Sequence, residues 1–314
     1  MKIKLTHNII SIVLLLITAV VLCALPLKYI KQEKIYIYTK TKIPSSQERG
    51  FALALRKKGY KVIINSENKL SDDDVSIWFS NIEAIERKID RASMKYCFLY
   101  VQDYFPINLD LTKENPIILT PYQDIFEHYT RTNIRSATFY LGENEKVFSF
   151  SGNQDKNLVS YYELRNKDTN LAKFARSNGI NLLGAFWINS DISMNVTEEY
   201  LYDMYNKKLK ESVITLVDNA QSNNLIPHEI IHATLSGSLV ITPYNKAVYD
   251  MYKNNVIYYD TLENAKKLIE EYKLNNQARQ KAVVNAYKIT TSKLTSIQSV
   301  ERFVELLKWL KSNY

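Results

Sequence analysis

Short apolar runs alternate along most of the chain with longer stretches in which apolar residues recur at helical spacing. Residues 35–38 and 60–64 are predicted as strands, and residues 45–58 between them as a helix. Ser45 can cap the start of this helix, and Gly59 can end it. A strand, a helix and a second strand in this order form the repeating unit of parallel sheets that are covered by helices.

The same alternation fills the rest of the chain and restarts after Gly142. Before this glycine we predict strands at 75–79, 96–101, 117–120 and 137–141, and helices at 82–92 and 121–131. After it we predict strands at 146–150, 180–186, 213–217, 239–242 and 256–259, and helices at 158–177, 246–253, 262–272, 276–289 and 299–311. The pattern therefore predicts an α/β protein with two domains, residues 34–141 and residues 142–314.

Residues 9–25 differ from the rest because they are almost wholly apolar, and lysines precede them. This composition predicts a single transmembrane helix within an N-terminal anchor and flank, residues 1–33. Lysines also follow the helix, so the charges on its two sides do not fix its orientation. Cys23 and Cys97 are the only cysteines, which excludes a disulfide framework. We therefore expect the globular body on the cytosolic face of the membrane, with a secretory lumen as the alternative.

The chain carries a formal net charge of +8, which suits anionic lipid headgroups or a phosphorylated ligand. This charge is spread along the sequence, without an arginine-rich run, an aromatic-basic RNA motif or a zinc-finger spacing. We therefore expect a membrane partner through the N-terminal helix and no nucleic-acid partner.

One stretch of the second half supports two different chemistries. His228, Glu229 and His232 form an HExxH motif, in which two histidines hold zinc and the glutamate acts as general base on a metal-bound water. The flanks favour a short helix instead, because Pro227 suits a first helical turn and Gly237 suits a C-terminal stop. That helix is only about three turns long, and no third zinc ligand is evident. A zinc hydrolase is therefore the alternative, and we predict no metal site.

The order of elements in the second half resembles the donor half of the GT-B glycosyltransferases, above all the compact spore-maturation type and related group-1 enzymes. That half contains a helix of the form F-E-x-x-x-x-G, a strand ending in threonine, a helix, a strand with a terminal aspartate, and a Leu- and Glu-rich helix. The corresponding segments here are 231–237, 238–242, 249–252, 256–260 and 262–271. The resemblance implies two Rossmann-like domains facing across a cleft and a nucleotide sugar as donor substrate, with no cofactor required.

The resemblance also indicates where a donor would bind. Parallel sheets hold ligands at their carboxyl edge, where helix N-termini offer N–H groups to phosphates. At the position of the family's donor-binding glutamate this chain has His232, with Glu229 one turn earlier, and we expect both residues in catalysis. Asp103, which follows a predicted strand, is the candidate general base. The residues expected to bind the donor are Ser151, Gly152, Asn153, Gly184, Asn219, Pro227, His228, Ser236 and Gly237.

These observations predict a membrane-anchored glycosyltransferase that transfers a sugar from a nucleotide sugar to a glycan or lipid-linked acceptor. A membrane-tethered, two-lobed solute-binding protein is a further alternative. The last two predicted helices, 276–289 and 299–311, are both expected to pack on the second domain. The chain would then not cross back to the first domain at its end, which argues against a solute-binding protein. His232 has a structural alternative, in which it packs against the sheet beside Ile231 and Leu235.

Overall fold

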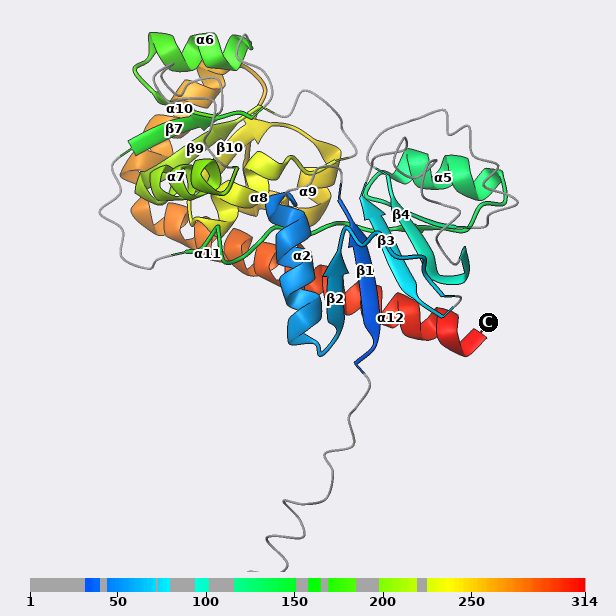
Figure 1. The fold of residues 1–314 in the computed structure, drawn as a ribbon. Coiled ribbons are helices and arrows are strands. Elements are labelled where there is room, and N and C mark those ends of the chain that lie inside the picture. Colours follow the sequence, from blue (N-terminus) through cyan, green and yellow to red (C-terminus); the bar gives the residue numbers. More distant parts are fainter. Residues whose placement is uncertain are drawn as a thin grey trace, which may run out of the picture.

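The computed structural model describes residues 32–39, 44–71, 73–79, 94–101, 116–150, 158–164, 169–184, 198–218 and 225–313. Within them, two separate parallel sheets form the centres of two lobes that lie side by side (Figure 1). The predicted membrane segment, residues 9–25, lies outside the described residues. None of the described helices combines the length and the apolar character that a bilayer crossing requires.

The first lobe is built on a six-stranded sheet with the order β2-β1-β3-β4-β5-β6. Its strands are apolar on both faces, as expected for a parallel sheet covered on both sides. Phe51 of α2 (Ser46–Lys57) is buried on one face, and Ile125 of α5 (Gln123–Arg131) is buried on the other. The strands and the short 3₁₀ turn are β1 (Lys34–Tyr38), β2 (Lys61–Ile64), β3 (Val75–Phe79), η2 (Met94–Tyr96), β4 (Cys97–Tyr100), β5 (Ile117–Thr120) and β6 (Ser136–Thr138).

The second lobe is built on a five-stranded sheet with the order β11-β10-β9-β7-β8. Helices α7, α8 and α9 cover one face and α6 and α10 the other, while α11 contributes to both cores. The strands are β7 (Leu158–Tyr162), β8 (Asn181–Leu183), β9 (Ser212–Val217), β10 (Leu239–Pro243) and β11 (Ile257–Tyr259). The helices are α6 (Asn170–Ser177), α7 (Glu198–Glu211), α8 (His228–Leu235), α9 (Lys246–Tyr252), η3 (Lys253–Asn255), α10 (Leu262–Leu274) and α11 (Asn276–Lys293).

The chain crosses between the lobes at two places that lie next to each other. The first crossing follows β6, and the second is the turn between α11 and α12 (Ser296–Asn313). Glu143 and Thr295 form a parallel bridge, and the Glu143 N–H donates to the Leu294 carbonyl at 2.9 Å. A Cβ at Gly142 would stand only 2.2 Å from the carbonyl carbon of Thr295. The two lobes are therefore joined by one narrow, tightly packed double connection.

Helix α12 returns to the first lobe and lies along its sheet (Figure 1). Phe303 is fully buried there, and its ring centroid lies 5.7 Å from that of Phe51 and 5.0 Å from that of Phe98. The expectation that both closing helices complete the second domain is wrong for α12, because its apolar face completes the core of the first lobe.

Most predicted strands and helices are present, two local predictions are wrong, and one helix was not predicted. Residues 158–162 form strand β7 instead of the start of a helix, because Tyr161 and Tyr162 are both fully buried, on opposite faces of the sheet. Residues 146–150 form a turn instead of a strand, with Phe148 buried against α8. Helix α7 was not predicted, and the predicted helix 82–92 lies outside the described residues.

Candidate functional site

The first turns of α2 and α8 meet at the junction of the two lobes (Figure 1). Helix α2 follows the carboxyl end of β1 and α8 follows that of β9, so each helix starts at the carboxyl edge of its sheet. Gln47 Nε2 lies 3.2 Å from His228 Nδ1. Open α/β sheets bind ligands at their carboxyl edges. The meeting point of two such edges is therefore the candidate site.

Glu143, in the first crossing, is the centre of this site. Its side chain is only 2% exposed, and its Oε1 lies 2.7 Å from Gln47 Nε2 and 2.6 Å from His228 Nδ1. Its Oε2 lies 3.1 Å from His232 Nε2, an ion-pair distance at an angle that is poor for a hydrogen bond. The carboxylate therefore links both lobes and both histidines of the HExxH motif.

His232 is enclosed on every side described. Its ring stacks on Phe148 with centroids 3.8 Å apart, and its Nδ1 lies 3.0 Å from the Tyr162 hydroxyl. Burial, and next the charge of Glu229, hold the pKa of Tyr162 well above the ordinary value. Tyr162 therefore keeps its proton and can donate it to Nδ1. This environment combines the two interpretations of His232, since the ring is packed in the core and also contacts the central carboxylate.

Burial alone would raise the pKa of the Glu143 carboxyl. The charge of His232 and the contacts with His228 and His232 outweigh this effect and hold the pKa well below its usual range. Glu143 is therefore an ionised carboxylate in the interior. Such a group is stable only with hydrogen-bond donors and a compensating charge, and the two imidazoles and Gln47 provide them.

Glu229 turns away from the two histidines. Its Oε1 accepts the backbone N–H of Leu164 at 3.1 Å, and the side chain is buried. Leu164 follows the carboxyl end of β7, so Glu229 holds the start of the loop after that strand. Its contacts are thus those of a residue that positions a loop at the carboxyl edge.

Helix α8 places the other predicted donor-binding residues at opposite ends of the second sheet. Pro227 is the N-cap residue itself, and no side-chain hydrogen bond caps this helix start. At the far end, Gly237 has a φ of 75° and Ser238 N–H donates to Ala233 O, the hydrogen bond of a Schellman stop. Ser236 and Gly237 therefore lie at the amino edge, about 12 Å from His228 along the helix. Gly184 directly follows β8 and lies at the carboxyl edge.

Five predicted site residues lie outside the described residues: Asp103, Ser151, Gly152, Asn153 and Asn219. Their proposed roles in binding and catalysis stay predictions. Sequence reasoning missed Gln47, Glu143, Phe148 and Tyr162, which complete the environment of the two histidines. None of these four residues belongs to the HExxH pattern, and they reach it only through the tertiary fold.

The zinc alternative is not supported. His228 Nδ1 and His232 Nε2 face the Glu143 carboxylate, and Glu229 points elsewhere. The ring centroids of the two histidines lie 6.3 Å apart. No group of three or more His, Cys, Asp or Glu side chains in the described ranges is arranged to hold a metal ion.

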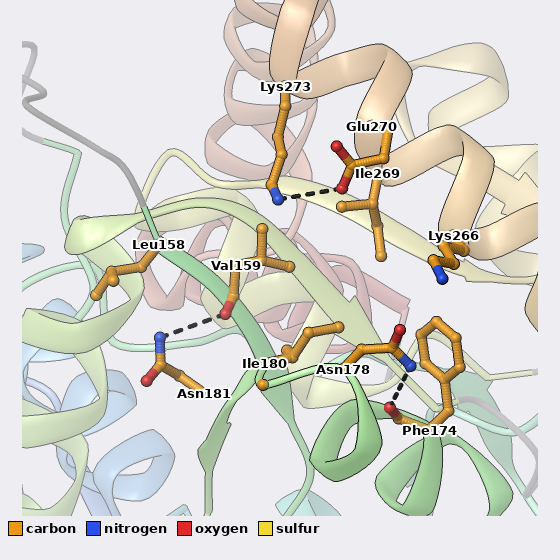
Figure 2. A pocket seen from close by; sticks show the side chains of 11 residues that line it. Leu158, Val159, Phe174, Asn178, Ile180, Asn181, Lys266, Ile269, Glu270 and Lys273 are labelled. Carbon is orange, nitrogen blue, oxygen red and sulfur yellow. Dashed lines mark hydrogen bonds and ion pairs between the residues drawn. The ribbon is translucent and has the colours of Figure 1, made fainter.

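A hollow of about 390 Å³ lies between α6 and α10 at the amino edge of the second sheet. Figure 2 shows Lys266, Glu270 and Lys273 of α10 across this hollow from Phe174 of α6. The first residues of β7 and β8 line it, so it opens at the edge opposite to His228 and is separate from the candidate site.

No protein-family model and no curated protein sequence matches the chain. Its structure is similar to that of an α-glucosyltransferase in complex with UDP-glucose and DNA containing an abasic site, with a TM-score of 0.61, 10% identity and coverage of 88% of this chain and 100% of that one. It is also similar to HepE from Anabaena in complex with UDP-glucose (TM-score 0.56, 8% identity, coverage 88% and 99%). A third similar structure is sucrose-phosphate synthase from Thermosynechococcus elongatus (TM-score 0.53, 9% identity, coverage 90% and 100%).

These similarities confirm the two-lobed α/β part of the predicted fold class, because all three span nearly the whole of both chains. The chain has the GT-B fold, in which two Rossmann-like lobes are combined. The solute-binding alternative is not supported by them. The sequence argument against that alternative was nevertheless wrong, because α12 does cross between the lobes.

Proposed function

We propose that this protein is a membrane-anchored glycosyltransferase that transfers a sugar from a nucleotide sugar to a glycan or lipid-linked acceptor. The GT-B fold supports this proposal, since similar structures include complexes with UDP-glucose. The observation that carries it is the contact between Gln47 and His228, because it joins the carboxyl edges of both sheets at one place. A donor held on the second lobe would there face an acceptor held on the first.

The start of α8 has the chemistry that a diphosphate requires. The helix dipole places partial positive charge at its N-terminus, where no side-chain hydrogen bond caps the chain. In the transfer, the acceptor hydroxyl oxygen bonds to the anomeric carbon, and the bond from that carbon to the phosphate oxygen breaks. The electron pair leaves with the nucleoside diphosphate, and the acceptor proton passes to a base, for which we propose Asp103. Helix N–H groups and an imidazole can stabilise the departing charge, so the proposed reaction requires no metal.

The proposal is tested by donor binding to the full-length chain. UDP-, GDP-, ADP- and dTDP-sugars are compared by thermal shift, and release of the nucleoside diphosphate is followed by chromatography. We expect one nucleotide class to raise the melting temperature, since a ligand that binds only the folded state stabilises it, by about 2.7 kcal/mol at a concentration of 100 Kd. The same class should be hydrolysed slowly without acceptor. If none of these donors stabilises the chain and none is cleaved, the proposal is wrong.

The anchor is proposed from residues 9–25 and tested separately. The full-length chain should stay in the membrane pellet after an alkaline carbonate wash, and Leu15→Arg should reduce that fraction, because a charge at the centre of a membrane helix is unfavourable by about 3 kcal/mol. Complete extraction of the wild-type chain would contradict anchoring. We place the globular body on the cytosolic face, and proteolysis of sealed vesicles of known orientation distinguishes this face from a lumen.

A further inference from the structure

We propose that Glu143 is a positioning residue that fixes the ring of His228, so that a protonated imidazole donates its Nε2–H to the diphosphate of the donor. This inference rests on the proposed function and assigns two residues to its leaving-group side. Glu143 is fully enclosed, whereas the His228 side chain is 21% exposed at the start of α8. Of the two histidines that face the buried carboxylate, His228 is thus the one that reaches the surface.

The hydrogen bonds of Gln47 decide which nitrogen of His228 carries a proton toward Glu143. The amide nitrogen of Gln47 has two hydrogens, and it donates to Glu143 Oε1 at 2.7 Å and to the Leu141 carbonyl at 3.3 Å. Both hydrogens are then used, so Gln47 does not donate to the nearby Nδ1 of His228. Nδ1 must itself be the donor in its 2.6 Å contact with Glu143 Oε1. The ring nitrogen of His228 that remains for a donor ligand in this proposal is therefore Nε2.

The buried charge decides where a positive charge is most stable. An ionised carboxylate with 2% exposure requires a nearby cation. His232 is only 1% exposed, and its Nε2 lies 3.1 Å from Glu143 Oε2 at an angle that is poor for a hydrogen bond. His228 can carry the charge with part of its ring in contact with water. The result is a carboxylate–imidazolium pair in which Nε2–H is a charge-assisted donor for phosphate oxygens.

Three described elements contribute side chains beside His228. The first crossing provides Glu143, α8 itself provides His232 one turn away, and α2 provides the neutral Gln47. Glu48, the next residue of α2, is engaged in the capping box with Ser45 and is turned toward its own helix start. The contact with the ionised Glu143 therefore favours the protonated form of His228.

The first test measures the affinity of the full-length chain for a nucleoside diphosphate by calorimetry between pH 5.5 and pH 8.5. UDP is the probe, and GDP, ADP or dTDP replaces it if the donor screen selects another base; the matching nucleoside is the reference. For the wild-type chain we expect diphosphate affinity to fall as His228 loses its proton. In Glu143→Gln the affinity should be about tenfold weaker at pH 7, and its fall should move to lower pH, because an imidazolium without its carboxylate is less stable. Affinity for the nucleoside should not change.

Matched variants separate positioning from a general effect on folding. His228→Gln should lose the pH dependence, and Glu143→Asp should restore part of the affinity lost in Glu143→Gln. The controls are His128→Gln and Glu305→Gln, whose side chains are exposed on α5 and α12 and should leave binding unchanged. If the wild type binds no diphosphate, the proposed function itself fails. If it binds, and Glu143→Gln and His228→Gln retain its affinity and pH profile, only the present inference is overturned.

A second test needs neither ligand nor activity. The chain has four histidines, so selective ¹⁵N-labelling of histidine gives a spectrum simple enough to assign with one variant per residue. In the wild type, His228 should show a protonated Nδ1 across the pH range and should titrate at Nε2. Glu143→Gln should lower the pH of this titration, while His128 stays unchanged. If Nδ1 of His228 carries no proton in the wild type, the inference is overturned, even if Glu143→Gln fails to fold.

Discussion

Gln47 and His228 are 181 positions apart in the sequence, and Gln47 Nε2 lies 3.2 Å from His228 Nδ1. One residue belongs to the first lobe and the other to the second. Both contact the same oxygen of Glu143, so the carboxylate is the element that holds the two helix starts together. The candidate site is thus a product of the pairing of the lobes and is absent from either lobe alone.

Gln47→Ala should destabilise the chain by about 1–3 kcal/mol, since it removes a hydrogen bond to a buried charged group. Urea unfolding of the full-length chain, followed by circular dichroism, measures this change. Gln123→Ala is the matched control, because Gln123 starts α5 as an exposed residue and donates its side-chain hydrogen bond to the exposed Glu127. Equal midpoints for the two variants would mean that the amide of Gln47 does not stabilise the junction.

His232→Glu places at this position the residue that the family resemblance leads one to expect. A second carboxylate would then lie beside Glu143 in the interior, so we expect a loss of about 3 kcal/mol or more in the free energy of unfolding. Adding Glu143→Gln to this variant removes the repulsion and should recover a large part of the loss. Thermal unfolding of both single variants and the double variant completes the cycle, and additive effects would contradict direct contact between the two positions.

Acid should remove the contribution of Glu143 to stability. The pKa of its carboxyl is lowered in the folded state, so its contribution is complete above the ordinary glutamate value of about 4.3 and decreases as the pH falls toward the folded-state value. The unfolding free energy of the wild type should therefore approach that of Glu143→Gln by about 1.5 kcal/mol between pH 5 and pH 3. Urea midpoints at the two pH values test this change, and Glu305→Gln should follow the wild type. If the difference in unfolding free energy between the wild type and Glu143→Gln instead increased from pH 5 to pH 3, the prediction would be wrong.

Phe303→Ala should destabilise the first lobe, although Phe303 belongs to the last helix of the chain. The ring is fully buried against Phe51 and Phe98, and its loss leaves a cavity, with an expected effect of about 3–5 kcal/mol. Trp309→Ala is a control on the same helix, because Trp309 is 57% exposed and its removal should change stability by less than about 0.5 kcal/mol. A small effect of Phe303→Ala would show that α12 does not complete the first core.

Gly142→Ala should loosen the double connection. Its new methyl group would overlap the carbonyl carbon and oxygen of Thr295, each 2.2 Å from the Cβ position, at a place where backbone hydrogen bonds oppose movement. We expect a loss of about 2–3 kcal/mol in chemical unfolding. Gly59→Ala meets no atom within 4 Å and keeps only the strain of a φ of 94°, about 1 kcal/mol. The difference between the two variants in lost unfolding free energy therefore measures the cost of the close contact with Thr295.

The lobes could be predicted because buried parallel strands must be apolar, and such runs are visible in one sequence. Strand β7 was misassigned because Leu158 to Tyr162 is too short a run to distinguish the two periods, and the helix after it was extended backward. The lobe of α12 was not predictable either. An amphipathic pattern shows that a helix face is buried and does not show against which sheet.

The site was only partly predictable for a similar reason. His228 and His232 stand in a recognisable motif, but their central partner Glu143 is 85 positions from His228 and belongs to no pattern. Ser236 and Gly237 were assigned to the donor from their proximity in sequence to His228. Helix α8 separates them from it, because a helix carries its two ends to opposite edges of the sheet.

The packing of α12 has a consequence for synthesis of the protein. Ribosomes deliver the chain from its N-terminus, and domains usually fold in the order in which they emerge. Here the strands β1–β6 emerge early but lack Val300, Phe303, Leu307 and Leu310, the last contributors to their core. The second lobe is formed by one uninterrupted segment of the chain, so it can fold before the core of the first lobe is complete. Truncated translation products that stop before α12 should therefore expose the apolar face of the first sheet that α12 covers. We expect chaperones to bind this exposed face.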